Sequence, residues 1–387
     1  MRTWAEIDLD RLEHNYRTMA ARLAPGTRFL AVVKANAYGH GAVRVARLME
    51  ELGCGYLAVA CIQEAVELRQ AGITLPILIL GYTDPDCAGD LIRYDITQAV
   101  TGLEMAEALS NSAAGLGKVK AHLKLDTGMG RLGFPVQDGA DSFDRIARAM
   151  AQENLAFEGV FTHFAVSDVE GPEAEAYTRM QYEAFIAAVE RIERAWGARF
   201  AIKHCTNSGA MVSYKETYLD LVRPGIALYG CYPDKPTPEL DLQPVMSLKA
   251  RVAQVKPFQP GQSVSYGRTY TTGAPRRVAV ITIGYADCLH RVLSNHMQVL
   301  IRGRRCDQIG RICMDMCMVD VTDLPEVRPG DEVTVFGTDG DQTIFVEERA
   351  ANAGTISYEL LCAVSKRVPR EYLRGGKRVA RTLSLPD

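Results

Sequence analysis

The run RFLAVVKANAYGHGA occupies residues 28–42. It decides between two possible folds for a parallel α/β protein, an open doubly wound sheet and a closed barrel. Its opening residues are mostly apolar and predict a buried strand at 28–33, which ends at Lys34. An open doubly wound sheet that binds dinucleotides would follow its first strand with the glycine fingerprint G-x-G-x-x-G. The residues KANAYGHGA lack that fingerprint. The run therefore favours a closed barrel, in which the residue after a strand lies at the catalytic end.

Strand-like and helix-like runs alternate on both sides of this segment up to about residue 230. The helix-like runs, such as EAYTRMQYEAFIAAVERIERA at 175–195, carry apolar residues at helical spacing and charges on the opposite face. Eight such strands with intervening helices predict a (β/α)8 TIM barrel over residues 9–233. The expected strands are 28–33, 56–60, 76–80, 96–100, 119–125, 157–161, 200–204 and 219–222.

The pattern changes after Pro233. The segment CYPDKPTPELDLQP (231–244) is expected to be a proline-rich linker. Beyond it, β-type runs alternate with turn-like segments such as RPGDEV and GTDGDQ, which predicts a mostly β domain over 234–387. The opening residues 1–8 also favour a strand, and the sequence leaves open which domain it joins.

Composition narrows the range of partners. The net charge of −3 gives no electrostatic reason to expect that the protein binds nucleic acid. The first residues lack the basic and apolar regions of a secretory signal, and no apolar run is long enough to span a membrane. We expect a cytoplasmic protein.

Ten cysteines are scattered through the chain, and only Cys313 and Cys317 lie close together. A zinc site needs two close pairs or nearby histidines. We therefore expect buried free thiols and no metal.

Lys34 is a candidate for chemistry. Taken alone, Lys34 is most simply interpreted as a surface lysine just past a strand. If it is instead buried at the strand end, its charge requires a partner or its amine a covalent role such as a Schiff base. Tyr38 and the glycines Gly39 and Gly41 suit a close-packed turn beside a ligand.

Nine motifs in order carry a resemblance to a known family. The run AVVKANAYGHGA resembles the cofactor-lysine signature of alanine racemases, and the other motifs extend the resemblance over essentially the whole chain. It implies a barrel followed by a β domain, pyridoxal 5'-phosphate as cofactor, and a head-to-tail homodimer with shared active sites. The other motifs are HLKLDTGMGRLGF (122–134), FTHFA (161–165), HCTNSGA (204–210), LVRPGIALYG (221–230), VSYGRTY (264–270), IGYAD (283–287), GRICMDM (310–316) and TISYE (355–359).

The resemblance implies which residues bind the cofactor. Lys34 would hold it as a Schiff base. Ser208, Gly225 and Ile226 follow the seventh and eighth strands, where barrels often bind phosphate; Ser208 alone would read as a helix N-cap. The other implied phosphate and ring ligands are Tyr38, Tyr358, His163, Asn207 and His204.

Arg223 matches the arginine that faces the pyridine nitrogen. A permanently charged arginine disfavours protonation of that nitrogen, which should suppress transamination and favour reprotonation at the α-carbon. Arg131 matches the arginine that bonds the cofactor's phenolic oxygen, and Lys124 matches a lysine that the family often carries as a carbamate.

Racemisation requires a base and an acid on opposite faces of the α-carbon. Lys34 covers one face, and Tyr266 of the partner subunit matches the second base, although alone it would read as a strand aromatic. The resemblance implies that Arg131 and the backbone N–H of Met314 hold the substrate carboxylate. Tyr285 and Asp315 match further residues of the substrate site.

The resulting hypothesis is an isomerase that interconverts L- and D-alanine. The resemblance implies D-alanine biosynthesis for peptidoglycan precursors as the usual role in bacteria, and the sequence leaves catabolism of alanine open as the alternative. A serine or broad-specificity racemase is the nearest alternative, and the bulky Tyr358 favours the smaller substrate. Decarboxylases of related architecture pair the pyridine nitrogen with an acid, so Arg223 argues against them. Non-catalytic pyridoxal-phosphate-binding proteins lack a second domain, so the residues past Pro233 argue against that class.

Overall fold

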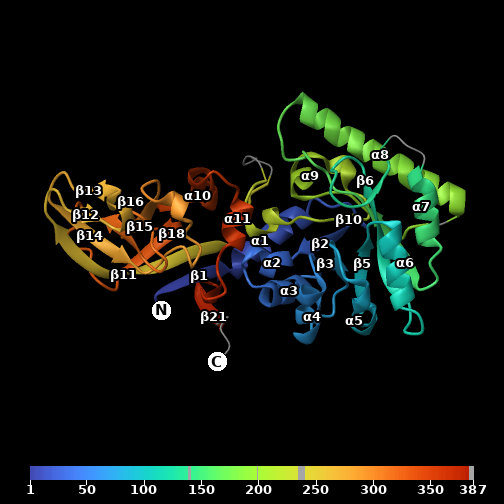
Figure 1. The fold of residues 1–387 in the computed structure, drawn as a ribbon, viewed down its shortest axis with the longest axis horizontal. Coiled ribbons are helices and arrows are strands. Elements are labelled where there is room, and N and C mark those ends of the chain that lie inside the picture. The colour runs from blue at the N-terminus through green and yellow to red at the C-terminus, as the bar shows by residue number, and fades with distance from the viewer. Residues whose placement is uncertain (138–140, 198, 234–239, 383–387) are drawn as a thin grey trace.

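The computed structural model describes residues 1–137, 141–197, 199–233 and 240–382, and it shows a barrel and a β-rich domain side by side (Figure 1). Residues 234–239 of the expected linker lie outside these ranges. No helix of the described residues is long and apolar enough to cross a membrane.

The barrel contains a strand at each of the eight expected places, so the predicted fold class is confirmed. The strands run parallel in the order β10-β2-β3-β4-β5-β6-β8-β9. Two backbone hydrogen bonds bring the ends of this order together, from Asp220 N to Lys203 O (3.1 Å) and from Arg223 N to Thr206 O (3.0 Å). The strands are β2 (Arg28–Val32), β3 (Tyr56–Val59), β4 (Ile77–Ile79), β5 (Ile96–Val100), β6 (Val119–Asp126), β8 (Leu155–Phe161), β9 (Ile202–His204) and β10 (Leu221–Val222).

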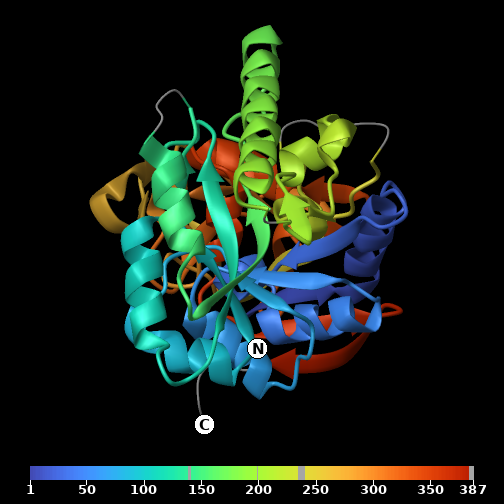
Figure 2. The ribbon, with the colours of Figure 1, turned by 90° about the vertical axis from the view of Figure 1, so that its right-hand side faces the viewer.

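Helices surround the barrel strands, and the long α8 projects beyond the others (Figure 2). Their apolar faces pack inward; α1 (Leu9–Ala20) buries Leu12 and Met19 completely. The Asp8 carboxylate caps α1 by accepting from the N–H groups of Asp10 and Arg11. The other helices are α3 (Ala42–Glu51), α4 (Ile62–Gln70), α5 (Ala88–Arg93), α6 (Leu103–Ser112), α7 (Asp141–Met150), α8 (Pro172–Trp196) and α9 (Ser208–Ser213).

The second domain is built on a sheet in the order β19-β18-β15-β16-β17-β14-β11-β1-β20-β21. The first strand, β1 (Thr3–Asp8), lies between β11 and β20, so the opening residues join this sheet. A separate two-stranded sheet pairs β12 (Ser263–Val264) with β13 (Tyr270–Thr271). The domain also includes β11 (Met246–Phe258), β14 (Arg276–Ile281), β15 (Gln298–Ile301), β16 (Arg304–Ile309), β17 (Cys317–Asp320), β18 (Glu332–Asp339), β19 (Gln342–Ile344), α10 (Val346–Ala353), α11 (Ser357–Cys362), β20 (Arg370–Arg374) and β21 (Lys377–Thr382).

The two domains meet at the loop that follows β2. The buried Arg370 donates from Nε to the carbonyl of Gly39 over 2.9 Å. A Cβ at Gly39 would lie 2.2 Å from the Leu361 carbonyl oxygen of α11, so only glycine permits this approach. The β domain therefore fixes the loop that carries Lys34.

The cysteines are all free, and six are buried as expected. The other four depart from the expectation: Cys61, Cys87 and Cys313 are only partly buried, and Cys362 lies exposed at the end of α11. Among the residues described, no cluster of His, Cys, Asp or Glu could hold a metal ion.

Candidate active site

The backbone after Lys34 turns with the opposite hand to an ordinary helix. Ala35, Asn36, Ala37 and Tyr38 have φ between 51° and 54°. Each such residue costs roughly 1–2 kcal/mol relative to the right-handed conformation. A strained turn of this kind persists only where the surroundings hold it.

Glu64 on α4 and Asn36 hold this turn. The Glu64 carboxylate accepts from the N–H of Ala35 (2.6 Å) and of Ala60 (2.8 Å), and Asn36 Oδ1 accepts from the N–H of Ala42 (2.8 Å). Lys34 is thereby fixed at the C-terminal end of β2, half-buried and without a hydrogen-bond partner among the described residues.

Positive charges gather around Lys34 at this end of the barrel. Burial lowers the pKa of Lys34, and the Arg131 guanidinium adds to the effect. Burial also lowers the pKa of His163 well below its usual range, followed by the charges of Arg223, Lys124, Arg131 and Lys34. These groups therefore share one site, which suits an anionic ligand such as a phosphate or a carboxylate.

Arg223 lies behind this site, directly after β10, and is 3% exposed. It donates from Nη1 to Nδ1 of His204 (2.9 Å) and from Nη2 to the Thr162 carbonyl (2.9 Å). Nη2 also lies 3.3 Å from Nδ1 of His163. Within the described residues Nε has no hydrogen-bond partner, so this nitrogen remains available to a ligand.

A second set of groups meets where β9 and β10 end. The Ser208 hydroxyl accepts from the N–H groups of Gly225 (2.8 Å) and Ala227 (3.4 Å), which leaves its proton free to donate. A Cβ at Gly225 would lie 2.5 Å from the Tyr38 hydroxyl, so that hydroxyl reaches the same place. Ile226 begins the short helix η3 (Ile226–Tyr229) here, and the Tyr358 ring lies 6.0 Å from that of Tyr38.

Asn207 has a local role that the sequence did not indicate. Its side chain, not that of Ser208, caps α9: Oδ1 accepts from the N–H of Ala210 (2.9 Å) and from the Ser167 hydroxyl (2.7 Å). The cap sets the first turn of α9, where Ser208 is the first helical residue.

Lys124 is buried on β6, and Nζ donates a 3.3 Å hydrogen bond to the Leu125 carbonyl. Burial lowers its pKa well below the ordinary value, and Arg223 contributes further. Nζ also lies 4.7 Å from the ring centre of Phe161. Arg131 is exposed on the following loop, whose first turn is formed by Asp126.

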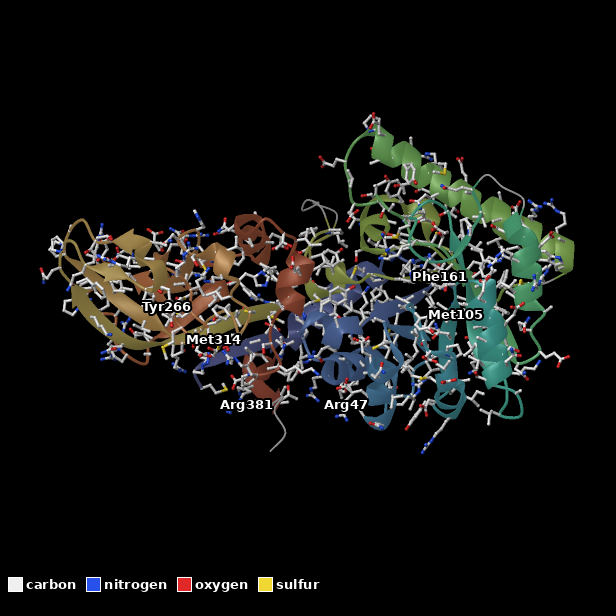
Figure 3. The ribbon with its side chains drawn as sticks, viewed as in Figure 1. Arg47, Met105, Phe161, Tyr266, Met314 and Arg381 are labelled. Atoms are coloured by element: carbon white, nitrogen blue, oxygen red, sulfur yellow. The ribbon has the colours of Figure 1, made fainter. Side chains whose placement is uncertain are left out.

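The remaining predicted residues lie on loops of the β domain. Tyr266 opens η4 (Tyr266–Arg268) and is 69% exposed; Tyr285 and Met314 are 42% and 53% exposed. The loops of the last two are joined by hydrogen bonds from Tyr285 N to Cys313 O and from Ala286 N to Met314 O, both 3.0 Å. Figure 3 places Tyr266 and Met314 in the β domain, far from Phe161 of the barrel. Within one chain, Tyr266 and Lys34 thus belong to different domains.

A buried carboxylate ties these loops together. Asp287, 2% exposed, accepts from Gly284 N (3.0 Å), from Arg2 (2.5 Å) and from Arg367 Nε (2.8 Å). Arg367 also donates to Asp315 (2.7 Å).

Sequence reasoning missed several residues that support the site, namely Glu64, Asp287 and Arg367. It also missed His122 of β6, which contacts His204, and Glu158 of β8, which lies beside His122. His122 carried a usable signal, because it lies two positions before Lys124 on one strand and so shares its face. The others act through partners distant in sequence, which no local pattern reveals.

Comparison with known proteins agrees with this geometry. The family model for the alanine racemase N-terminal domain matches residues 7–233, and the model for the C-terminal domain matches residues 245–372. The chain belongs to the alanine racemase family. The alanine racemase of Desulfovibrio desulfuricans is 49% identical over 96% of this chain and 98% of that protein. The alanine racemase of Methanococcus maripaludis is 45% identical, with the same coverage.

Solved structures of alanine racemases also superpose on the chain. The Clostridium difficile enzyme is 40% identical, with a TM-score of 0.94, over 100% of this chain and 99% of that one. The Bacillus anthracis enzyme, solved with bound L-Ala-P, is 35% identical, with a TM-score of 0.91, over 98% and 97%. The prediction of a racemase, and hence of an enzyme, is confirmed at the level of the family.

Proposed function

We propose that this chain interconverts L- and D-alanine with pyridoxal 5'-phosphate as its cofactor. The observation that carries the proposal is Arg223, which is buried at the site that it shares with Lys34 and His163, and whose Nε has no hydrogen-bond partner among the described residues. An arginine in this place distinguishes a racemase from the decarboxylases, which put an acid there.

The chain's groups fit the cofactor. The lowered pKa of Lys34 keeps more of its amine neutral, which is the form that attacks a carbonyl. The Ser208 hydroxyl, the Tyr38 hydroxyl and the backbone at Gly225 and Ile226 can surround a phosphate. When bound, pyridoxal phosphate supplies an electron sink that acidifies the α-hydrogen of an amino acid.

Two bases on opposite faces of the α-carbon would move the proton. Lys34 Nζ would remove or return it on one face, and the hydroxyl of Tyr266 of a second subunit would serve the other. His163 supports this arrangement, because its Nδ1 faces Arg223 and leaves Nε2 for a further partner. With Arg223 at Nδ1 and the hydroxyl of Tyr266 at Nε2, His163 would connect the arginine to the tyrosine through hydrogen bonds.

The substrate carboxylate would be bound by Arg131 and by the backbone N–H of Met314, with Tyr285 and Asp315 lining the same side. A carbamate on Lys124 would place a negative charge beside Arg131 and orient it. Tyr358 would limit the space beside the substrate side chain, which favours alanine over serine.

A homodimer would complete the site. Tyr266, Tyr285 and Met314 form an exposed group of large side chains on the β domain, and such groups mark interaction surfaces. A second copy placed head to tail would bring them over the partner's Lys34.

The test is chiral separation of products after the purified protein, supplied with pyridoxal phosphate, meets L-alanine or L-serine. We expect rapid D-alanine and little D-serine. Dominant D-serine would reassign the substrate, and no D-product from either would reject a racemase. For the proposed role in cytoplasmic supply of peptidoglycan precursors, the chain should restore growth of a D-alanine-requiring bacterium.

A further inference from the structure

A row of polar side chains runs through the interior of the barrel from Arg223. Nη1 of Arg223 donates to Nδ1 of His204 over 2.9 Å, and Nε2 of His204 lies 2.9 Å from Nδ1 of His122. Nε2 of His122 lies 3.6 Å from Oε1 of Glu158. We call these four residues the polar column.

The polar column joins the two ends of the barrel. Arg223 follows β10 at the end that carries Lys34, whereas Glu158 contacts Thr97 (2.9 Å) and Tyr56 (3.0 Å) where β5 and β3 begin. Barrel interiors are usually filled by branched aliphatic side chains. A continuous polar path through this core is therefore a feature that needs a function.

The two ends of the polar column determine which ring nitrogen of each histidine carries the proton. Arg223 can only donate, so Nδ1 of His204 has to be the unprotonated, accepting nitrogen. The proton of His204 then lies on Nε2 and is donated to Nδ1 of His122. The proton of His122 is thereby left on Nε2, which faces the carboxylate of Glu158. All three N–H groups point from the arginine toward the carboxylate, so their dipoles reinforce one another.

Burial agrees with two neutral rings. His122 and His204 are fully buried, and burial lowers the pKa of both. Contact with His122 lowers the pKa of Glu158 to about 2, and the hydrogen bonds from Thr97 and Tyr56 act in the same direction. Glu158 is therefore an anion at neutral pH.

The fold leaves space for this arrangement. A Cβ at Gly159 would lie 2.6 Å from Cε1 of His122, so the ring needs a glycine on the neighbouring strand. The pairing of β6 and β8 shifts register between Ala121 and His122. The His204 ring is stacked on Phe161, with 4.8 Å between centroids.

We propose that Glu158 and His122 are positioning residues that act through His204 to hold Arg223 with its Nε toward the cofactor pocket. The inference rests on the proposed function for the role of Nε, whereas the column itself stands on the geometry. Arg223 is a buried cation with no ion-pair partner among the described residues. Glu158 places a carboxylate at the far end of the polar column, 3.6 Å from Nε2 of His122, a nitrogen with no hydrogen-bond partner within the described residues.

Nitrogen-15 NMR of the holoenzyme with labelled histidine tests the proton arrangement directly. We expect His122 and His204 to be neutral with the proton on Nε2, in signals protected from water. Glu158→Gln should shift the Nε2–H proton signal of His204, although the two residues do not touch. Tyr56→Phe keeps the carboxylate and serves as the control, with the His204 signal at its wild-type position. A His204 signal unmoved by Glu158→Gln, or a proton on Nδ1 of His204, would overturn the proposal.

Kinetics test whether Glu158 acts through His122. We expect Glu158→Gln to lower kcat roughly 3- to 10-fold and His122→Leu at least as much, with cofactor content unchanged. The double variant should be no slower than His122→Leu alone, because residues that act in series are not additive. Multiplied losses would contradict the proposal. The NMR signals do not depend on turnover, so failure of the column and failure of the racemase assignment remain distinguishable.

Discussion

The rings of Tyr38 and Tyr358 lie 6.0 Å apart, although one follows the second strand of the chain and the other lies on α11 of the β domain. Tyr38 is further packed against Tyr229, with 5.0 Å between centroids. Each domain thus contributes one phenol to the same wall. The β domain of the same chain therefore packs beside the turn that follows Lys34, where we propose that the substrate pocket lies.

Tyr358→Ala should enlarge this pocket. We predict that the ratio of serine to alanine racemisation, measured as kcat/KM, rises by roughly 10-fold, since one or two heavy atoms in a pocket are worth about 1–3 kcal/mol. Tyr358→Phe keeps the ring and is the matched control. An unchanged ratio in Tyr358→Ala would refute the view that this phenol limits the substrate.

The lowered pKa of Lys34 predicts the pH dependence of cofactor capture. Burial favours the neutral amine, so the ammonium loses its proton below the ordinary lysine pKa of about 10.4. The rate at which cofactor-free protein binds pyridoxal phosphate should rise with pH through this lowered pKa and then level off. Free Nα-acetyl-lysine is the reference. A protein profile that coincides with the reference would contradict the assigned environment.

Lys124 should carry a carbamate. Burial lowers the pKa of its amine well below the ordinary value and so favours the neutral form, and only the neutral amine adds carbon dioxide. We predict a carbamate signal in carbon-13 NMR after exposure to labelled bicarbonate. The signal should disappear in Lys124→Arg and persist in the surface control Lys118→Arg. Absence of the signal from the wild type would show that Lys124 is not carbamylated.

Asp287→Asn should loosen the loops that carry Tyr285 and Met314. The carboxylate is buried, but Arg2 and Arg367 are 41% and 32% exposed, so solvent moderates the loss. We predict that unfolding becomes easier by about 2 kcal/mol and that KM rises. Asp315→Asn, at the exposed end of Arg367, is the control for stability and should cost well under half as much. If the two variants lost the same free energy of unfolding, the stabilisation would not depend on the buried carboxylate of Asp287.

The barrel could be predicted from local patterns because its strands are short apolar runs. In the second domain, strands such as β16 (Arg304–Ile309) and β21 (Lys377–Thr382) are rich in charge because exposed sheet positions tolerate it, so no apolar run marks them. The partners of β1 lie hundreds of residues away, so its place in the second sheet was undecidable from the sequence.

The residues of the candidate site that stand in motifs could be predicted from the sequence. The contacts between residues distant in sequence could not. Lys34 and Arg223 stand in motifs at strand ends. The left-handed turn at Ala35–Tyr38 runs against the intrinsic preference of four non-glycine residues and persists through Glu64. The contact of His122 with Glu158 joins two strands and has no local signature.

We propose that each active site combines Lys34 of one subunit with Tyr266 of another. We expect Lys34→Ala and Tyr266→Phe each to be inactive alone. The two variants should be co-expressed with different affinity tags and the mixed dimer isolated through both tags. One of its two sites would then have both bases intact, so we predict about half of the wild-type alanine racemisation. A mixed dimer as inactive as its parents would contradict the shared site.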